Sequence, residues 1–204
     1  MSDAFALVEK PSLGTILERS LPIIKAAAGQ LMVGGLALAT AYWLIGFLSA
    51  GFGVVLLPLI GTPMLIGMLA VSYQAARGEE VKWESLADGF KMPQAYLLGV
   101  MAMAAIFLGL WVMVIPGLYL MFALVYAKCF MLRGKSASES FAASVKLFNG
   151  NLGISLVVAI FGAVISALGN SVWVLAALTT PLMIVLQMVT FELLMKLPDN
   201  KQLA

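Results

Sequence analysis

The sequence predicts an all-α integral membrane protein whose six transmembrane helices form three hairpins. Composition is the first observation: 62% of the 204 residues are hydrophobic and 11% are charged, whereas a soluble domain carries about 25% charged residues. Length is the second, because six segments approach the run of about 20 apolar residues that a membrane-spanning helix needs. Charge placement is the third, because Lys and Arg gather at alternate ends of those segments.

The six segments follow one another in a single membrane domain that we expect to occupy residues 1–204. The longest apolar stretch is too long for one span, and Pro116 divides it. Proline disfavours helix for the residue before it and suits the start of a new helix, so a tight turn is predicted at 115–117. The expected spans are 26–48, 54–76, two within 95–132, 152–168 and 172–194.

The charged residues predict the orientation of the spans. The connections at 49–53, 114–117 and 169–171 contain no charged residue, whereas the connections at the opposite ends of the spans contain Lys and Arg. Cytoplasmic loops carry the excess of Lys and Arg, so both termini are predicted in the cytoplasm. Residues 1–10 lack the basic stretch and short apolar core of a cleavable signal peptide, so the first span is expected to be an uncleaved anchor.

Two cytoplasmic connections resemble each other in sequence. Residues 84–92 (ESLADGFKM) and 139–147 (ESFAASVKL) each follow an Arg-Gly pair, which is typical of the basic last turn and C′ glycine of a helix. In both, and before the first span, a Glu precedes a Lys by seven residues. This spacing is about two α-helical turns and places the pair on one face. The pattern predicts three units with pseudo-threefold order, at 12–78, 79–134 and 135–197; the alternative is that interfacial helices share it for physical reasons alone.

Each unit is expected to begin with a short amphipathic helix on the cytoplasmic surface. Apolar residues recur at helical spacing, and Ser136 with Glu139 has the spacing of a capping box. Such helices lie at the interface with their apolar face toward lipid or the bundle. Their basic residues could hold anionic headgroups, although interleaved acidic residues weaken that interpretation and topology explains them as well. The candidate contacts for lipid or a partner are Trp83, Phe90, Lys91, Phe141, Lys146 and Phe148.

The sequence offers no residue set for catalysis or metal binding. It has no His and a single Cys, Cys129, which excludes Ser-His-Asp and Cys-His catalysis and leaves no zinc ligand set. No charged residue lies near the middle of a span, and Glu192 and Lys128 are expected to extend to cytoplasmic water. A net charge of +2 gives no basis for nucleic-acid binding, and no cofactor is expected. The polar residues within spans are expected to bond between helices rather than to form a substrate site; they are Gln187, Thr179, Thr180, Thr190 and Ser166.

The order of these motifs resembles a group of bacterial six-span membrane proteins of unknown function. The likeness is carried by the Arg-Gly pairs, segments 84–87 and 139–142, spans that open on 93–94 or 149–151, and the turn at 115–117. The group includes the membrane domain that accompanies some glycerophosphodiester phosphodiesterases. The resemblance implies a fold and a bacterial inner-membrane location. The phosphodiesterase domain is absent from this sequence, so the resemblance implies no activity and no site residue.

Three functions are open from the sequence. We expect a non-enzymatic inner-membrane scaffold or accessory subunit that organises lipid or a protein partner through its cytoplasmic face. The alternative is a protein that binds or transports lipid or a hydrophobic small molecule, with a cavity lined by Gly and small polar residues. The third is a membrane-bound enzyme. The abundant glycines are expected to pack helices within one chain, and the alternative is a face for a homo-oligomer.

Overall fold

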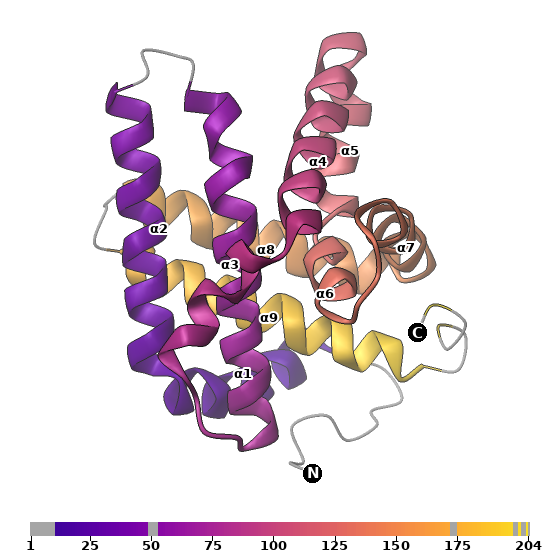
Figure 1. The fold of residues 1–204 in the computed structure, drawn as a ribbon. Helices are drawn as coiled ribbons and strands as arrows, with labels where there is room; N and C mark the ends of the chain where they lie inside the picture. Colours follow the sequence, from indigo (N-terminus) through magenta and orange to yellow (C-terminus); the bar gives the residue numbers. More distant parts are fainter. Residues whose placement is uncertain (1–10, 49–52, 172–174, 198–199, 201–202, 204) are drawn as a thin grey trace.

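The computed structural model describes residues 11–48, 53–171, 175–197, 200 and 203 (Figure 1). Every long regular element in these ranges is a helix, which confirms the all-α class. In chain order they are α1 (Leu13–Ala26), α2 (Ala28–Leu48), α3 (Gly53–Arg77), η2 (Trp83–Lys91), α4 (Pro93–Val112), α5 (Val114–Ala123), α6 (Ala127–Leu132), α7 (Ala137–Gly150), α8 (Leu152–Ser171) and α9 (Ala176–Met195).

Six helical segments in the described ranges are long and apolar enough to cross a membrane, as the sequence predicts. They are Ala28–Ile45, Pro58–Arg77, Pro93–Val112, Val114–Leu132, Leu152–Gly169 and Ala176–Met195. Length and composition therefore support a multi-pass membrane protein.

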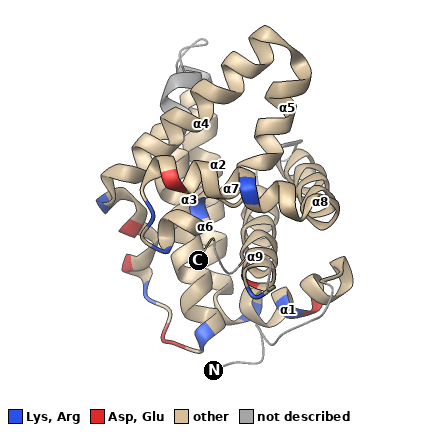
Figure 2. Ribbon diagram, turned by 90° about the vertical axis from the view of Figure 1, so that its right-hand side faces the viewer, with Lys and Arg blue, Asp and Glu red and all other residues tan. Residues whose placement is uncertain are grey.

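Consecutive spans contact each other: α2 with α3, α4 with α5, and α8 with α9. Figure 1 shows α2 and α3 upright, α4 and α5 rising beside them, and α8 and α9 crossing behind; Figure 2 shows α9 nearly end-on. The third pair therefore crosses the first two. The second span of each pair is more buried than the first. Tyr73 of α3, Phe130 of α6, which ends the fourth span, and Phe191 of α9 belong to one core cluster.

Charged side chains occupy one part of the molecule. Figure 2 shows Lys, Arg, Asp and Glu over the lower half and on α7, whereas the upper ends of α4 and α5 carry none. Exposed residues at that uncharged end are apolar, among them Trp111 at 89% and Ile115 at 79%. The described residues thus have the charged end and the bare end that the sequence predicts.

The turn predicted at 115–117 forms two residues earlier. Helix α4 ends at Val112, Met113 is extended, and α5 begins at Val114. Pro116 therefore lies in the first turn of α5, where its missing N–H removes no helical hydrogen bond. A side chain at Gly117 would collide with Leu110 of α4, so glycine lets the two helices meet directly after the turn.

The fourth span consists of two helices rather than the one expected. Between them, at 124–126, the Ser144 hydroxyl of α7 donates to the Ala123 carbonyl (2.7 Å) and accepts from the Tyr126 N–H (3.2 Å). A side chain inserted into the helical ladder is an established cause of a bend. No Pro or Gly lies in 118–132, so the interruption is fixed by α7.

Both Arg-Gly pairs end their helices as predicted. Gly78 and Gly134 have φ values of +70° and +90°, a left-handed conformation that favours glycine. The N–H of each glycine bonds to the carbonyl three residues before it, and the next N–H bonds to the carbonyl five residues before it. This pair of bonds is the Schellman motif, which satisfies the last carbonyls of a helix.

Candidate functional site

The segment predicted as an interfacial α-helix is the 3₁₀-helix η2, and it packs along α3. Glycine lets the two backbones touch at two points. A β-carbon at Gly67 of α3 would collide with the Leu86 carbonyl group, and one at Gly89 of η2 would collide with the Pro63 carbonyl group. Since the residue numbers rise along η2 as they fall along α3, the two run antiparallel. The helix η2 therefore runs beside α3 instead of lying wholly beyond the end of that span.

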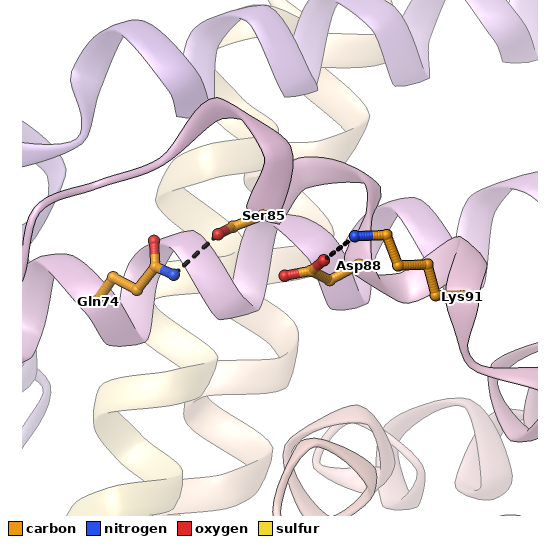
Figure 3. A network of polar contacts seen from close by, with 4 residues as sticks. All are labelled: Gln74, Ser85, Asp88 and Lys91. Carbon is orange, nitrogen blue, oxygen red and sulfur yellow. Dashed lines mark hydrogen bonds and ion pairs between the residues drawn. The ribbon is translucent and has the colours of Figure 1, made fainter.

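Polar contacts fix the start of η2 and the loop before it. The Gln74 amide of α3 donates to the Ser85 hydroxyl at 2.8 Å (Figure 3) and accepts from the Lys82 N–H at 3.3 Å. From α2, the Gln30 amide donates to the Val81 carbonyl at 3.3 Å. Two spanning helices therefore hold this segment, which makes η2 a fixed platform.

Three predicted contact residues lie on the outer side of η2. Trp83 and Phe90 are 54% and 40% exposed, and the Lys91 ammonium pairs with the Asp88 carboxylate at 2.8 Å (Figure 3). The expectation that Glu84 and Lys91 share a face is wrong, because a 3₁₀-helix has three residues per turn and sets residues seven apart about 120° around its axis. The same geometry places Lys91 on the face of Asp88, because the two are three residues, or one turn, apart.

The other three predicted contact residues lie on α7 and differ in exposure. Lys146 is exposed, and Phe141 is half-buried against the small core cluster that includes Met131. Phe148 is buried, because its ring packs edge-on against Tyr119 of α5 with the ring centroids 6.1 Å apart. Phe148 is therefore a core residue, and its predicted place on the contact surface does not fit this burial.

The predicted capping box at the start of α7 is confirmed. The Glu139 carboxylate accepts from the Ser136 hydroxyl (2.7 Å) and from its N–H (2.9 Å), while the Glu139 N–H donates back to the hydroxyl (3.4 Å). The bond from the hydroxyl, and then that from the N–H, favours the ionised form and lowers the pKa of Glu139. The box satisfies N–H groups that have no partner within the helix.

Helices α3, α6 and α9 meet at a buried carboxylate. Glu192 of α9 is 8% exposed. Its Oε1 accepts from the Tyr73 hydroxyl of α3 and from the guanidinium of Arg133, the residue that ends α6, each at 2.6 Å. The expectation that Glu192 extends to water is wrong, because the carboxylate has charged and polar partners inside the protein, as a buried charge requires.

Aromatic rings pack against this ion pair. The Arg133 guanidinium lies over the Phe191 ring, 4.7 Å from its centroid, and Phe130 meets the same ring edge-on at 4.8 Å. The Tyr126 ring also approaches Phe191, and its hydroxyl donates to Ser155 of α8 at 3.2 Å. Electrostatic interactions are stronger in such apolar surroundings, and leaving either charged partner alone there is costly. These contacts therefore join the three inner helices, α3, α6 and α9, at one point.

A sequence signal for this centre appears when the three proposed units are aligned on the basic residue that follows or ends the second span of each unit. Each inner helix carries a buried side chain four positions before such a residue: Tyr73 before Arg77, Cys129 before Arg133 and Glu192 before Lys196. The Arg-Gly pairs alone do not reveal this position, because the third unit has Leu197 in place of the glycine.

Two of the polar residues predicted to bond between helices bond instead inside their own helix. The hydroxyls of Thr179 and Thr190 donate to carbonyls four residues before them, at 3.1 and 2.7 Å. Ser166 of α8 instead contacts the Met183 sulfur of α9 at 2.9 Å, so the predicted bonding between helices is found for Ser166 but not for the two threonines. In the described ranges, no three Cys, Asp or Glu side chains are grouped as metal ligands.

No protein-family model, curated protein or solved structure matches this chain. The resemblance to bacterial six-span membrane proteins is supported only by the six candidate spans. Fold and site together define a multi-pass helical membrane protein with a paired carboxylate at its centre and the fixed aromatic platform η2 on its side.

Proposed function

We propose that this protein is a non-enzymatic scaffold or accessory subunit of the bacterial inner membrane, with both termini in the cytoplasm. It organises lipid or a protein partner through its charged face. The observation that carries the proposal is the attachment of η2 to α3 through Gly67 and Gly89, which leaves Trp83 and Phe90 facing outward. Aromatic side chains on a fixed backbone bury a large area at little entropic cost, so they serve as anchors in interfaces.

Two glycines in the spans favour a scaffold over a carrier, because neighbouring helices occupy the space beside them. A β-carbon at Gly35 of α2 would lie 3.1 Å from the Ala176 carbonyl of α9, and one at Gly99 of α4 would lie 2.7 Å from the Pro58 carbonyl of α3. Glycines that line a cavity would have open space at these points. These glycines pack helices within the chain, and a homo-oligomer stays a prediction.

The contacts between elements support the proposed repeat of units 12–78, 79–134 and 135–197. Each short helix packs on the second span of the preceding unit in cyclic order: η2 on α3, α7 on α6 and α1 on α9. The units differ in detail, because η2 is a 3₁₀-helix and the second span of the middle unit is interrupted. A pseudo-threefold axis would pass between α3, α6 and α9.

Native mass spectrometry of the protein, extracted gently from its own membrane, tests the scaffold. We expect a stoichiometric protein or lipid partner that is lost with Trp83→Ala and kept with Trp111→Ala, the same substitution at the uncharged end of α4. Loss with both variants, or with neither, would contradict the role of η2. A bound hydrophobic small molecule that neither variant displaces, without a protein partner, would favour the carrier.

Reporter fusions at the C-terminus test the orientation. Green fluorescent protein folds in the bacterial cytoplasm, and alkaline phosphatase needs the oxidising periplasm for its disulfides. We therefore expect a fluorescent fusion and an inactive phosphatase fusion. The reverse pattern would place the charged face in the periplasm and overturn this part of the proposal.

A further inference from the structure

The far end of η2 lies deep along α3. The η2 backbone at Gly89 rests on Pro63, and Pro63 precedes Arg77, the last residue of that span, by 14 residues. A rise of about 1.5 Å per residue puts the contact about 21 Å along the helix from the charged end. Since a hydrocarbon core is about 30 Å thick, the contact lies beyond the middle of the span.

At this depth η2 carries an ion pair that the protein does not enclose. The Asp88 and Lys91 side chains are joined at 2.8 Å and stay 38% and 68% exposed (Figure 3). The Arg133–Glu192 pair is different, because only 10% of the Glu192 side chain is exposed. Charged side chains facing lipid tails are costly, and the cost falls where water and headgroups reach them through a thinned bilayer.

We propose that lipid phosphate headgroups of the cytoplasmic leaflet descend along η2 as far as the Asp88–Lys91 pair, so that the bilayer is thinned beside α3. Lys82 and Lys91, at the two ends of η2, give phosphate a cationic contact at both depths. The inference rests on the proposed function, which places the charged face in the cytoplasm, and it names lipid headgroups as what this part of the platform contacts.

Depth-dependent fluorescence quenching tests the proposal. Single cysteines at Phe90→Cys and Ala87→Cys, both exposed positions, are introduced with Cys129→Ser and labelled with a fluorophore. The matched control is Trp43→Cys on α2, a 66% exposed position. It is next to Tyr42, whose ring lies against Gly61 of α3, two residues from Pro63. The proteins are reconstituted in phosphatidylethanolamine–phosphatidylglycerol vesicles that contain lipids with a nitroxide on the headgroup or at the middle of the acyl chain.

We expect the headgroup nitroxide to quench more than the acyl-chain nitroxide at positions 87 and 90, and less at position 43. Stronger acyl-chain quenching at all three positions overturns the proposal, because the ion pair would then lie among lipid tails. Weak quenching by both nitroxides at 87 and 90 also overturns it, since protein or water would cover η2 instead. Stronger headgroup quenching at all three would show that α3 does not cross the membrane at this level, which is a failure of the proposed membrane topology itself.

Neutralising the pair tests its part in recruiting headgroups. Asp88→Asn with Lys91→Gln, combined with Ala87→Cys, should lower the ratio of headgroup to acyl-chain quenching below that of Ala87→Cys alone. An unchanged ratio would refute recruitment by this ion pair. Thermal unfolding in detergent shows that each variant is folded before it is compared.

Discussion

Removing the Glu192 carboxylate should separate the inner helices. Glu192→Ala leaves the Arg133 guanidinium over Phe191 without its counter-ion and the Tyr73 hydroxyl without its acceptor. Breaking a buried ion pair in this way costs about 3–5 kcal/mol. Because the Arg133 side chain is 33% exposed and regains part of its hydration, we expect a loss near the lower limit, about 3 kcal/mol.

The conservative variant predicts an order of stabilities. Glu192→Gln keeps an oxygen that accepts from Tyr73 and Arg133 but loses the charge. Hydrogen bonds to charged groups contribute about 1.5–3 kcal/mol and neutral ones about 0.5–1.5 kcal/mol, so this variant should lose about 1–2 kcal/mol. Asp88→Ala is the control, because it removes a carboxylate from an exposed pair and such pairs contribute at most about 1 kcal/mol.

Two measurements check this prediction. Unfolding titrated in mixed micelles should rank wild type and Asp88→Ala above Glu192→Gln, and Glu192→Gln above Glu192→Ala. The single thiol, Cys129, is a built-in probe because it is buried on α6 near Arg133. A maleimide should label it faster in Glu192→Ala. If Glu192→Ala loses no more stability than Asp88→Ala and labelling is unchanged, the carboxylate does not hold the inner helices together.

Three further contacts give predictions. Ser144→Ala removes the hydroxyl that bonds to the backbone between α5 and α6, and it leaves the buried backbone groups there unpaired. The free energy of unfolding should therefore fall by about 1–3 kcal/mol in the same titration. An unchanged value would contradict the role of the hydroxyl. Gly67→Ala directs a methyl group into the η2 backbone, so proteases should cleave the connection between α3 and α4 faster, whereas Gly29→Ala, with open space beside it, should match wild type. Glu139 has a lowered pKa, so its stabilisation of the start of α7 is complete above its ordinary pKa of 4.5 and is lost as the pH falls through the lowered value. The protection of the amides at this helix start, taken as the ratio of the intrinsic to the observed exchange rate at each pH, should therefore fall on acidification, and in Ser136→Ala it should be low already at neutral pH.

The spans and the charged face could be predicted because both depend on the order of residues along the chain. Hydrophobic length sets the spans: the second was expected at 54–76, and α3 is Gly53–Arg77. Capping is local as well, so Ser136 with Glu139 and the Arg-Gly pairs were identified from a few neighbouring residues. Turn geometry is less local, and the turn before Pro116 was misplaced by two residues.

The features that escaped prediction depend on contacts between distant segments. The pattern of 83–91 fits an α-helix, yet its backbone packs on Gly67, and this tertiary contact favours a 3₁₀-helix over the local preference. The break in the fourth span needs Ser144, which lies 21 residues after Ala123. Burial of Glu192 depends on α3 and α6 bringing their partners to one point, which no property of α9 alone indicates.

The proposed repeat has a physical reason to be imperfect at its centre. Perfect threefold copies would place one side chain three times at the axis, and three carboxylates there would repel and lose their charge. The chain instead has Tyr73, Cys129 and Glu192 at these positions, which supply one hydroxyl donor, one small thiol and one acid. Of the equivalent basic residues, Arg133 turns inward to Glu192, whereas Arg77 lies over the Tyr73 ring, 5.9 Å from its centroid. In the proposed repeat, divergence at this position leaves one acid for one inward basic residue, Arg133, so the ion pair is satisfied without a second buried carboxylate.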